Sequence, residues 1–149
     1  MAEASTAAGR GDAPARTPAQ IYSLLFGATL LLAGIIGFFV NSDFDVGTDV
    51  QGDDLILFEV NAWHNIIHIA SGLLGLALAA RPASARLFAL GFGAVYLTVT
   101  IWGFIAGDNI LFGLAPINAA DNLLHLAIAL LGIAAGLASK DAIGRPQPG

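Results

Sequence analysis

Four long apolar runs alternate with polar connections along the chain. The runs are roughly residues 21–40, 61–80, 87–106 and 120–138. At a helical rise of 1.5 Å per residue, each run is long enough to cross a hydrocarbon core of about 30 Å. The pattern therefore predicts an all-α integral membrane four-helix bundle over residues 20–138. Residues 1–19 and 139–149 lack apolar periodicity, and we expect them to form disordered cytoplasmic tails.

The four runs form two similar halves. A shift of 66 residues lays Phe26-Gly27-Ala28 on Phe92-Gly93-Ala94, and a shift of 57 matches polar residues of the second and fourth runs. The polar matches are Asn61 with Asn118, Asn65 with Asn122, and His68 with His125. The sequence thus predicts two helical-hairpin repeats that are parallel and related by a pseudo-two-fold axis along the membrane normal.

Charge divides the connections into two kinds. The chain is 56% hydrophobic and 11% charged, against about 25% charged in soluble proteins. Its six basic residues all lie in the tails or between the second and third runs: Arg10, Arg16, Arg81, Arg86, Lys140 and Arg145. The other two connections and the helix starts beside them carry only acids: Asp43, Asp45, Asp49, Asp53, Asp54, Glu59, Asp108 and Asp121.

This division places both termini in the cytoplasm by the positive-inside rule. It predicts a multi-pass protein of the bacterial plasma (inner) membrane, with the lipid bilayer as its main partner. A nucleic-acid partner is not expected, because the few basic residues are scattered over three segments. A homo-oligomer or a larger membrane complex stays open.

The residue types limit the chemistry. The absence of cysteine excludes disulfides, thiolate metal sites and a cysteine nucleophile. The sequence shows no Ser–His–Asp arrangement and no phosphate-binding glycine loop. We therefore expect no catalytic residues and, more broadly, a protein that is not an enzyme.

Polar residues gather on one face of the second and fourth runs, near their acidic ends. At 100° per residue, that face carries Asn61, His64, Asn65 and His68 in one run and Asn118, Asp121, Asn122 and His125 in the other. Small residues continue both faces: Gly72, Gly75, Ala79, Ala129, Gly132 and Gly136. Small residues let helices approach closely in lipid, so we expect the second and fourth helices to pack against each other.

Three interpretations of this polar cluster remain open. It could be a structural network that fixes helix register in a small accessory protein. His64, His68, His125 and Asp121 could instead hold Zn or Cu, or His68 and His125 could be axial ligands of a haem, in a redox-linked role. The third interpretation is a proton or small-molecule path, or a site for a quinone-like headgroup.

Two motifs of the cluster resemble those of a known family. The stretch from Leu57 to His68, followed by Gly72 and Gly75, and the stretch from Pro116 to His125 are similar to a bacterial, mostly actinobacterial, membrane family known as domain of unknown function 4383. The similarity extends from about Pro18 to Ala138. It implies four transmembrane helices and no activity, and the eight polar positions of the cluster match the motifs of the family.

Overall fold

Each of the first two helices begins at a polar cap. In the computed structural model, which describes residues 15–105 and 110–139, helix α1 is Pro18–Gly37 and helix α2 is Ala62–Leu78. Thr17 caps α1: its hydroxyl accepts a hydrogen bond from the Gln20 amide, and the Gln20 side chain accepts one from the Thr17 amide. Asn61 caps α2 in the same position.

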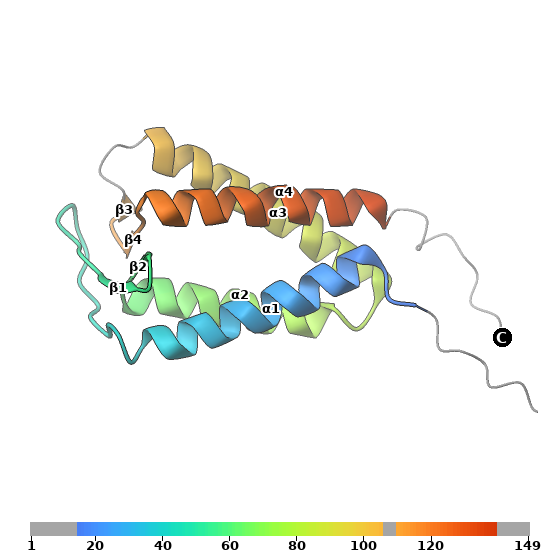
Figure 1. Ribbon diagram of the computed structural model, residues 1–149, viewed down its shortest axis with the longest axis horizontal. Coiled ribbons are helices and arrows are strands. Elements are labelled where there is room, and N and C mark those ends of the chain that lie inside the picture. Colours follow the sequence, from blue (N-terminus) through green and yellow to red (C-terminus); the bar gives the residue numbers. More distant parts are fainter. Residues whose placement is uncertain (1–14, 106–109, 140–149) are drawn as a thin grey trace, which may run out of the picture.

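The third and fourth helices complete the bundle. Helix α3 is Pro82–Ile105, and helix α4 is Ala119–Ala138 with Asn118 as its cap. Figure 1 shows α1 lying along α2 and α3 along α4, and the two hairpins meet mainly where α1 contacts α3 and α4. The all-α four-helix fold is confirmed. Helix α1 begins at Pro18, two residues before the expected domain start.

The helix bounds differ from the expected runs in two places. Pro82 occupies the first turn of α3, so α3 begins five residues before the expected 87. Proline fits the first helical turn because the amide that it lacks would have no partner there. Helix α2 has 17 residues, fewer than the expected run 61–80. By length and composition α1, α3 and α4 can cross a membrane, whereas α2 is a shorter apolar helix.

Two short β-hairpins close one end of the bundle, and the apolar pattern did not predict them. Strand β1 (Asp53–Leu55) pairs antiparallel with β2 (Phe58–Val60), and β3 (Ile110–Leu111) with β4 (Ala115–Pro116). The turns contain Ile56 at φ 66° and Phe112 at φ 53°. These conformations are uncommon for large side chains, and they leave both side chains exposed, Ile56 at 83% and Phe112 at 70%.

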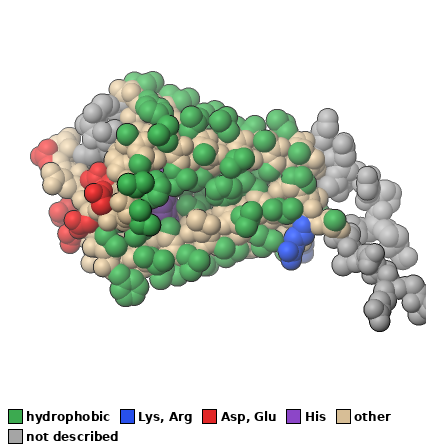
Figure 2. Space-filling model, in the orientation of Figure 1, with side chains coloured by type: hydrophobic (Ala, Val, Ile, Leu, Met, Phe, Trp, Pro, Cys, Tyr) green, Lys and Arg blue, Asp and Glu red, His purple; other side chains and the backbone are tan. Residues whose placement is uncertain are grey.

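Opposite charges occupy opposite ends of the bundle. Figure 2 shows Asp and Glu at the β-hairpin end, Lys and Arg at the other end, and mostly hydrophobic side chains between them. Among the described residues, Arg16, Arg81 and Arg86 carry the positive charge. The remaining members of the expected charge pattern, Arg10, Lys140, Arg145 and Asp108, lie outside the described residues.

The small residues of α2 and α4 pack against α1 and α3, so the expected close packing of α2 against α4 is wrong. A methyl group on Gly72 would lie 2.5 Å from the Leu31 amide nitrogen of α1. A methyl group on Gly132 would lie 2.8 Å from the Ala89 carbonyl oxygen of α3. A row of small residues permits close approach of a neighbouring helix, but it does not indicate which helix that neighbour is. Glycines on α1 and α3, such as Gly27, meet it within the hairpin.

The other predicted packing residues have the same kind of neighbours. Added methyl groups at Gly75 and Gly136 would meet Phe88 and Leu90 of α3, and the Ala129 carbonyl lies against Gly93 of α3. At the basic end, the Ala79 carbonyl accepts a hydrogen bond from the Gln20 side chain at 3.0 Å. The Gly136 carbonyl accepts one from Arg86 Nε at 3.0 Å. This cation at a helix C-terminus interacts favourably with the helix dipole.

Candidate metal centre and its polar frame

The capping asparagines of α2 and α4 each reach into the opposite repeat. Asn61 accepts from the His64 amide at 2.9 Å and donates from Nδ2 to the Leu114 carbonyl at 2.7 Å. Asn118 accepts from the Asp121 amide at 3.0 Å and donates to the Leu57 carbonyl at 2.9 Å. Leu57 and Leu114 are themselves related by the 57-residue shift. The two bonds therefore form a reciprocal pair that joins the repeats.

His64 and Asp121 occupy equivalent positions and meet through the backbone of Glu59. The Glu59 amide donates to Asp121 Oδ2 at 3.1 Å, and the Glu59 carbonyl lies 2.8 Å from His64 Nδ1. A carbonyl can only accept, so His64 carries its proton on Nδ1 in this arrangement. The same Asp121 oxygen also accepts from the Asn118 amide at 3.0 Å. The Asp121 carboxylate thus accepts hydrogen bonds from two backbone amides, those of Glu59 and Asn118.

Asn65 and Asn122 are equivalent residues one turn further into the bundle. Asn65 donates from Nδ2 to the Asn41 carbonyl at 2.9 Å, and its side-chain oxygen points at Gly37 of α1. The Asn122 oxygen points at Gly103 of α3 in the same way. Within the described residues neither side-chain oxygen has a hydrogen-bond partner. Any side chain at Gly37 or Gly103 would overlap these oxygens.

The three histidines converge, as the shared face and the repeat predicted. One ring nitrogen from each of His64, His68 and His125 lies within 4.8 Å of the others. The ring centroids of His64 and His68 are 4.4 Å apart, and those of His64 and His125 are 6.3 Å apart. His64 and His125 are buried and His68 is half-buried. The Tyr96 ring of α3 meets His125 edge-on at 4.9 Å.

Two of these imidazoles each have one buried nitrogen without a partner in the part of the chain that the structure describes. Among the described residues, the buried Nδ1 atoms of His68 and His125 have no hydrogen-bond partner. A buried polar atom without a partner costs about 1–3 kcal/mol, and such atoms are few in native structures. The polar cluster of the sequence is thus two groups. A frame of Asn61, Asn118, Asp121 and the Glu59 backbone is well bonded. The inner residues Asn65, Asn122, His68 and His125 each have one unpartnered side-chain atom within the described residues.

Two cavities flank the inner histidine pair. The larger, of about 310 Å³, lies between α2 and α3, and the smaller, of about 140 Å³, lies between α1 and α4. His68 and His125 line both cavities. His64 lines the larger and Asp121 the smaller. In Figure 2, histidine is visible in a hollow among hydrophobic side chains.

This arrangement suits one metal ion held by three imidazoles. Neutral imidazole is a good ligand for Zn and Cu, and a metal-bound histidine usually donates its other N–H to a carbonyl or carboxylate. His64 already makes such a bond to Glu59. Asp121, the fourth candidate ligand, lies outside the group of converging nitrogens. Three converging imidazoles can all bind one ion. A haem with His68 and His125 as axial ligands would leave His64 without a ligand role.

The sequence interpretation missed two residues that line the larger cavity, Tyr96 and Ser71. Tyr96 aligns with Leu30 under the 66-residue shift, and Ser71 aligns with Ile128 under the 57-residue shift. Both are polar where their repeat mates are apolar. Differences between the repeats were therefore the signal that could have found them.

The fold and the site define a small all-α protein made of two helical-hairpin repeats, with membrane-type apolar helices and a buried histidine cluster. The chain belongs to the family described as Domain of unknown function (DUF4383), whose model matches residues 20–138. The resemblance seen in the sequence is thereby confirmed. No curated protein and no solved structure matches the chain.

Proposed function

We propose that this protein is a four-pass protein of the bacterial plasma membrane that binds one transition-metal ion through His64, His68 and His125. The observation that carries the proposal is the convergence of three ring nitrogens within 4.8 Å, with the Nδ1 atoms of His68 and His125 unpartnered among the described residues. The protein acts as a metal-binding accessory protein, and we assign it no reaction.

The surroundings favour a cation that arrives from the acidic end. The loop between α1 and α2 carries Asp43, Asp45 and Asp49, and its positions 42–49 are exposed. Clustered charge of one sign raises the local concentration of the opposite ion. The positive-inside rule supports a position of this end outside the cytoplasm. The ion therefore enters from the extracytoplasmic side and is held within the outer half of the bilayer.

The purely structural alternative accounts for only part of the cluster. Hydrogen bonds of the polar frame fix the starts of α2 and α4 without any ligand. Within the described residues they leave the Nδ1 atoms of His68 and His125 without a hydrogen-bond partner. A bound ion would use both rings, and its binding energy would offset the cost of burying them.

The direct test is metal stoichiometry. The protein is purified with an affinity tag that contains no histidine, placed in lipid nanodiscs, incubated with Zn²⁺ or Cu²⁺ and desalted before elemental analysis. We expect about one ion per chain. His68→Ala and His125→Ala should each lower the retained metal at least about tenfold, because loss of a ligand costs more than the 10–100-fold typical of outer-shell changes.

A matched control lies on the lipid-facing surface of α3. Thr98 donates its hydroxyl to the Ala94 carbonyl of its own helix and is exposed, so Thr98→Ala should retain the wild-type stoichiometry. Metal should also raise the thermal unfolding midpoint of the wild type but not of the histidine variants. A wild-type protein that keeps no metal, or histidine variants that keep as much as the wild type, would refute the proposal. A Soret band in the purified protein would assign the histidines to haem instead.

A further inference from the structure

The two cavities beside the histidines are related by the internal repeat. Every α2 and α3 residue that lines the larger cavity aligns with an α4 or α1 residue that lines the smaller one. Tyr96 and Leu30 are one such pair, and Ser71 and Ile128 are another. The two cavities therefore occupy equivalent positions in the two repeats. The lining residues that differ between them determine what each cavity can bind.

The larger cavity has the greater volume and a different set of polar groups, with Val95 and His64 where the smaller cavity has Thr29 and Asp121. Its volume is about 310 Å³ against about 140 Å³, and only the former reaches the range of about 300–1,000 Å³ typical of small-molecule sites. Hydroxyls of Tyr96 and Ser71 replace the leucine and isoleucine of the smaller cavity. A few polar groups in an apolar wall fix the orientation of a ligand.

The mouth of the larger cavity is apolar. Val95, Ile67 and Phe112 line it and are 57%, 38% and 70% exposed. Such side chains on the flank of an apolar bundle face lipid, so a ligand enters from the bilayer. No described residue that lines the cavity is Lys, Arg, Asp or Glu, and this lining favours an uncharged headgroup.

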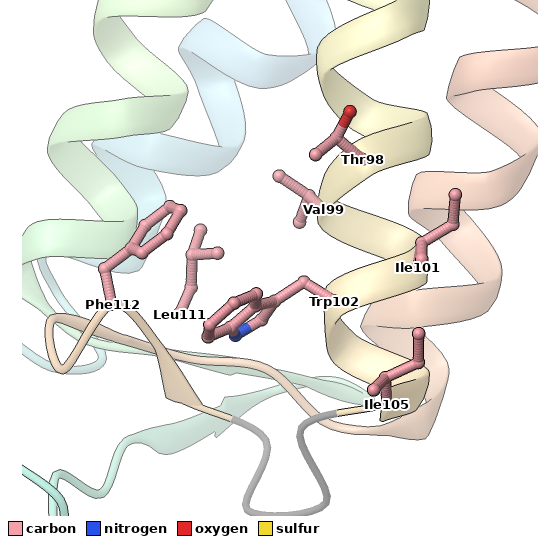
Figure 3. Close-up of a pocket in the computed structure, with 7 residues that line it drawn as sticks. All are labelled: Thr98, Val99, Ile101, Trp102, Ile105, Leu111 and Phe112. Atoms are coloured by element: carbon pink, nitrogen blue, oxygen red, sulfur yellow. The ribbon is translucent and has the colours of Figure 1, made fainter.

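An apolar groove continues from the cavity along α3. It has a volume of about 180 Å³ and shares Val99, Leu111 and Phe112 with the larger cavity. Figure 3 shows the Trp102 ring extending from α3 toward Leu111 and Phe112, with Ile101 and Ile105 beside it on the same helix. The Trp102 and Phe112 rings are 5.4 Å apart. The groove therefore offers an apolar, partly aromatic surface to a tail, next to the polar end of the cavity.

We propose that the cavity between α2 and α3 binds a lipid-soluble quinone, with the ring against Tyr96 and Ser71 and the tail in the groove at Trp102. A quinone is uncharged, planar and apolar at its tail, and its carbonyls accept hydrogen bonds from hydroxyls or imidazole N–H groups. This matches the lining, the entrance and the groove. The site goes beyond the proposed metal centre and requires no bound ion.

The experiment uses Trp102 as the reporter in metal-free, chelator-treated protein in nanodiscs. The chain has two tryptophans, and Trp63→Phe leaves Trp102 alone. Trp63 lies on α2 against Phe44, away from the groove. Decylubiquinone is titrated against this variant, and its quenching of the fluorescence should saturate. Because the protein holds no metal, the outcome is independent of the metal proposal.

Two substitutions at equivalent positions test the choice of cavity. Val99→Phe fills the larger cavity, and Ala33→Phe at its repeat mate fills the smaller one. The dissociation constant should rise at least tenfold in Val99→Phe and in the double variant Tyr96→Leu, Ser71→Ile, which copies the smaller cavity. It should stay within twofold in Ala33→Phe. Circular dichroism and thermal midpoints identify any variant that fails to fold, and the milder Tyr96→Leu alone then replaces the double variant.

Three outcomes would overturn the proposal. Quenching that rises linearly with quinone in every variant would indicate simple partition into lipid. Equal weakening by Val99→Phe and Ala33→Phe would show that the larger cavity is not the site. A phospholipid that native mass spectrometry finds retained in this cavity and that the quinone does not displace would identify the occupant as lipid.

Discussion

Single side chains at the helix starts serve both their own helix and the other repeat. The Asn118 side-chain oxygen caps α4, and its Nδ2 donates to the Leu57 carbonyl in the β1–β2 hairpin. In the same way, the Asn61 oxygen caps α2 and its Nδ2 donates to the Leu114 carbonyl. The two functions use different atoms of one carboxamide. They can therefore be separated by substitution.

Asn118→Ala should lower the free energy of unfolding by about 1–3.5 kcal/mol, because it removes a cap worth about 0.5–2 kcal/mol and a hydrogen bond worth about 0.5–1.5 kcal/mol. Asn118→Ser keeps a capping oxygen and loses the Nδ2 donor without adding charge, so its loss should be smaller. Reversible unfolding in mixed micelles measures both. Equal losses in the two variants would show that the bond to Leu57 carries the whole effect.

The sequence predicted the residues of the site better than their bonds. His68 and His125 followed from the repeat, and the shared face brought His64 to them. The link between His64 and Asp121 could not be predicted, because it runs through the Glu59 backbone and main-chain groups carry no residue signature. Tyr96 and Ser71 were not predicted, because they differ from their repeat mates Leu30 and Ile128, whereas the polar cluster shows as identities between the repeats.

Helices packed within one hairpin depend on glycine at the points of closest approach. Gly72→Ala would place a methyl group 2.5 Å from the Leu31 amide nitrogen of α1. Backbone atoms cannot move aside as a side chain can, so the helices must separate and the protein should lose about 1–3 kcal/mol of stability. The measurement is unfolding of the variant in the same micelles.

Gly91→Ala is the matched control, since nothing lies within 4 Å of a methyl group at that position. Helix propensity alone should make it neutral or stabilising by up to about 1 kcal/mol. A loss as large as that of Gly72→Ala would mean that close packing is not the cause.

Helices were predictable and the hairpins between them were not. An apolar run of about 20 residues specifies a helix in lipid, because every backbone group must find its partner within the segment. Strands β1 to β4 have only two or three residues each, which is too few to show an alternating apolar pattern. Their turns place Ile56 and Phe112 at positive φ, which neither residue type would indicate.

At the scale of the whole molecule, the charge division predicts the orientation of the bundle in the membrane. The chain has no cysteine, so single cysteines can report topology. Asp45 and Ala83 are exposed at opposite ends. A membrane-impermeant maleimide should label Asp45→Cys in intact spheroplasts and Ala83→Cys only after permeabilisation. The wild type is the unlabelled control, and the reverse labelling would invert the proposed orientation and the side from which a metal ion enters.

The reciprocal asparagine bonds also set an order of assembly. Asn61 is separated from its partner Leu114 by 53 residues, so translation at about 5–20 residues per second delivers the partner roughly 3–10 s later. During that interval the first hairpin resides in the bilayer with one carboxamide donor still unsatisfied. The emerging second repeat then supplies both missing bonds at once. Closure of this end of the bundle therefore has to wait for the second repeat, and neither repeat alone can complete it.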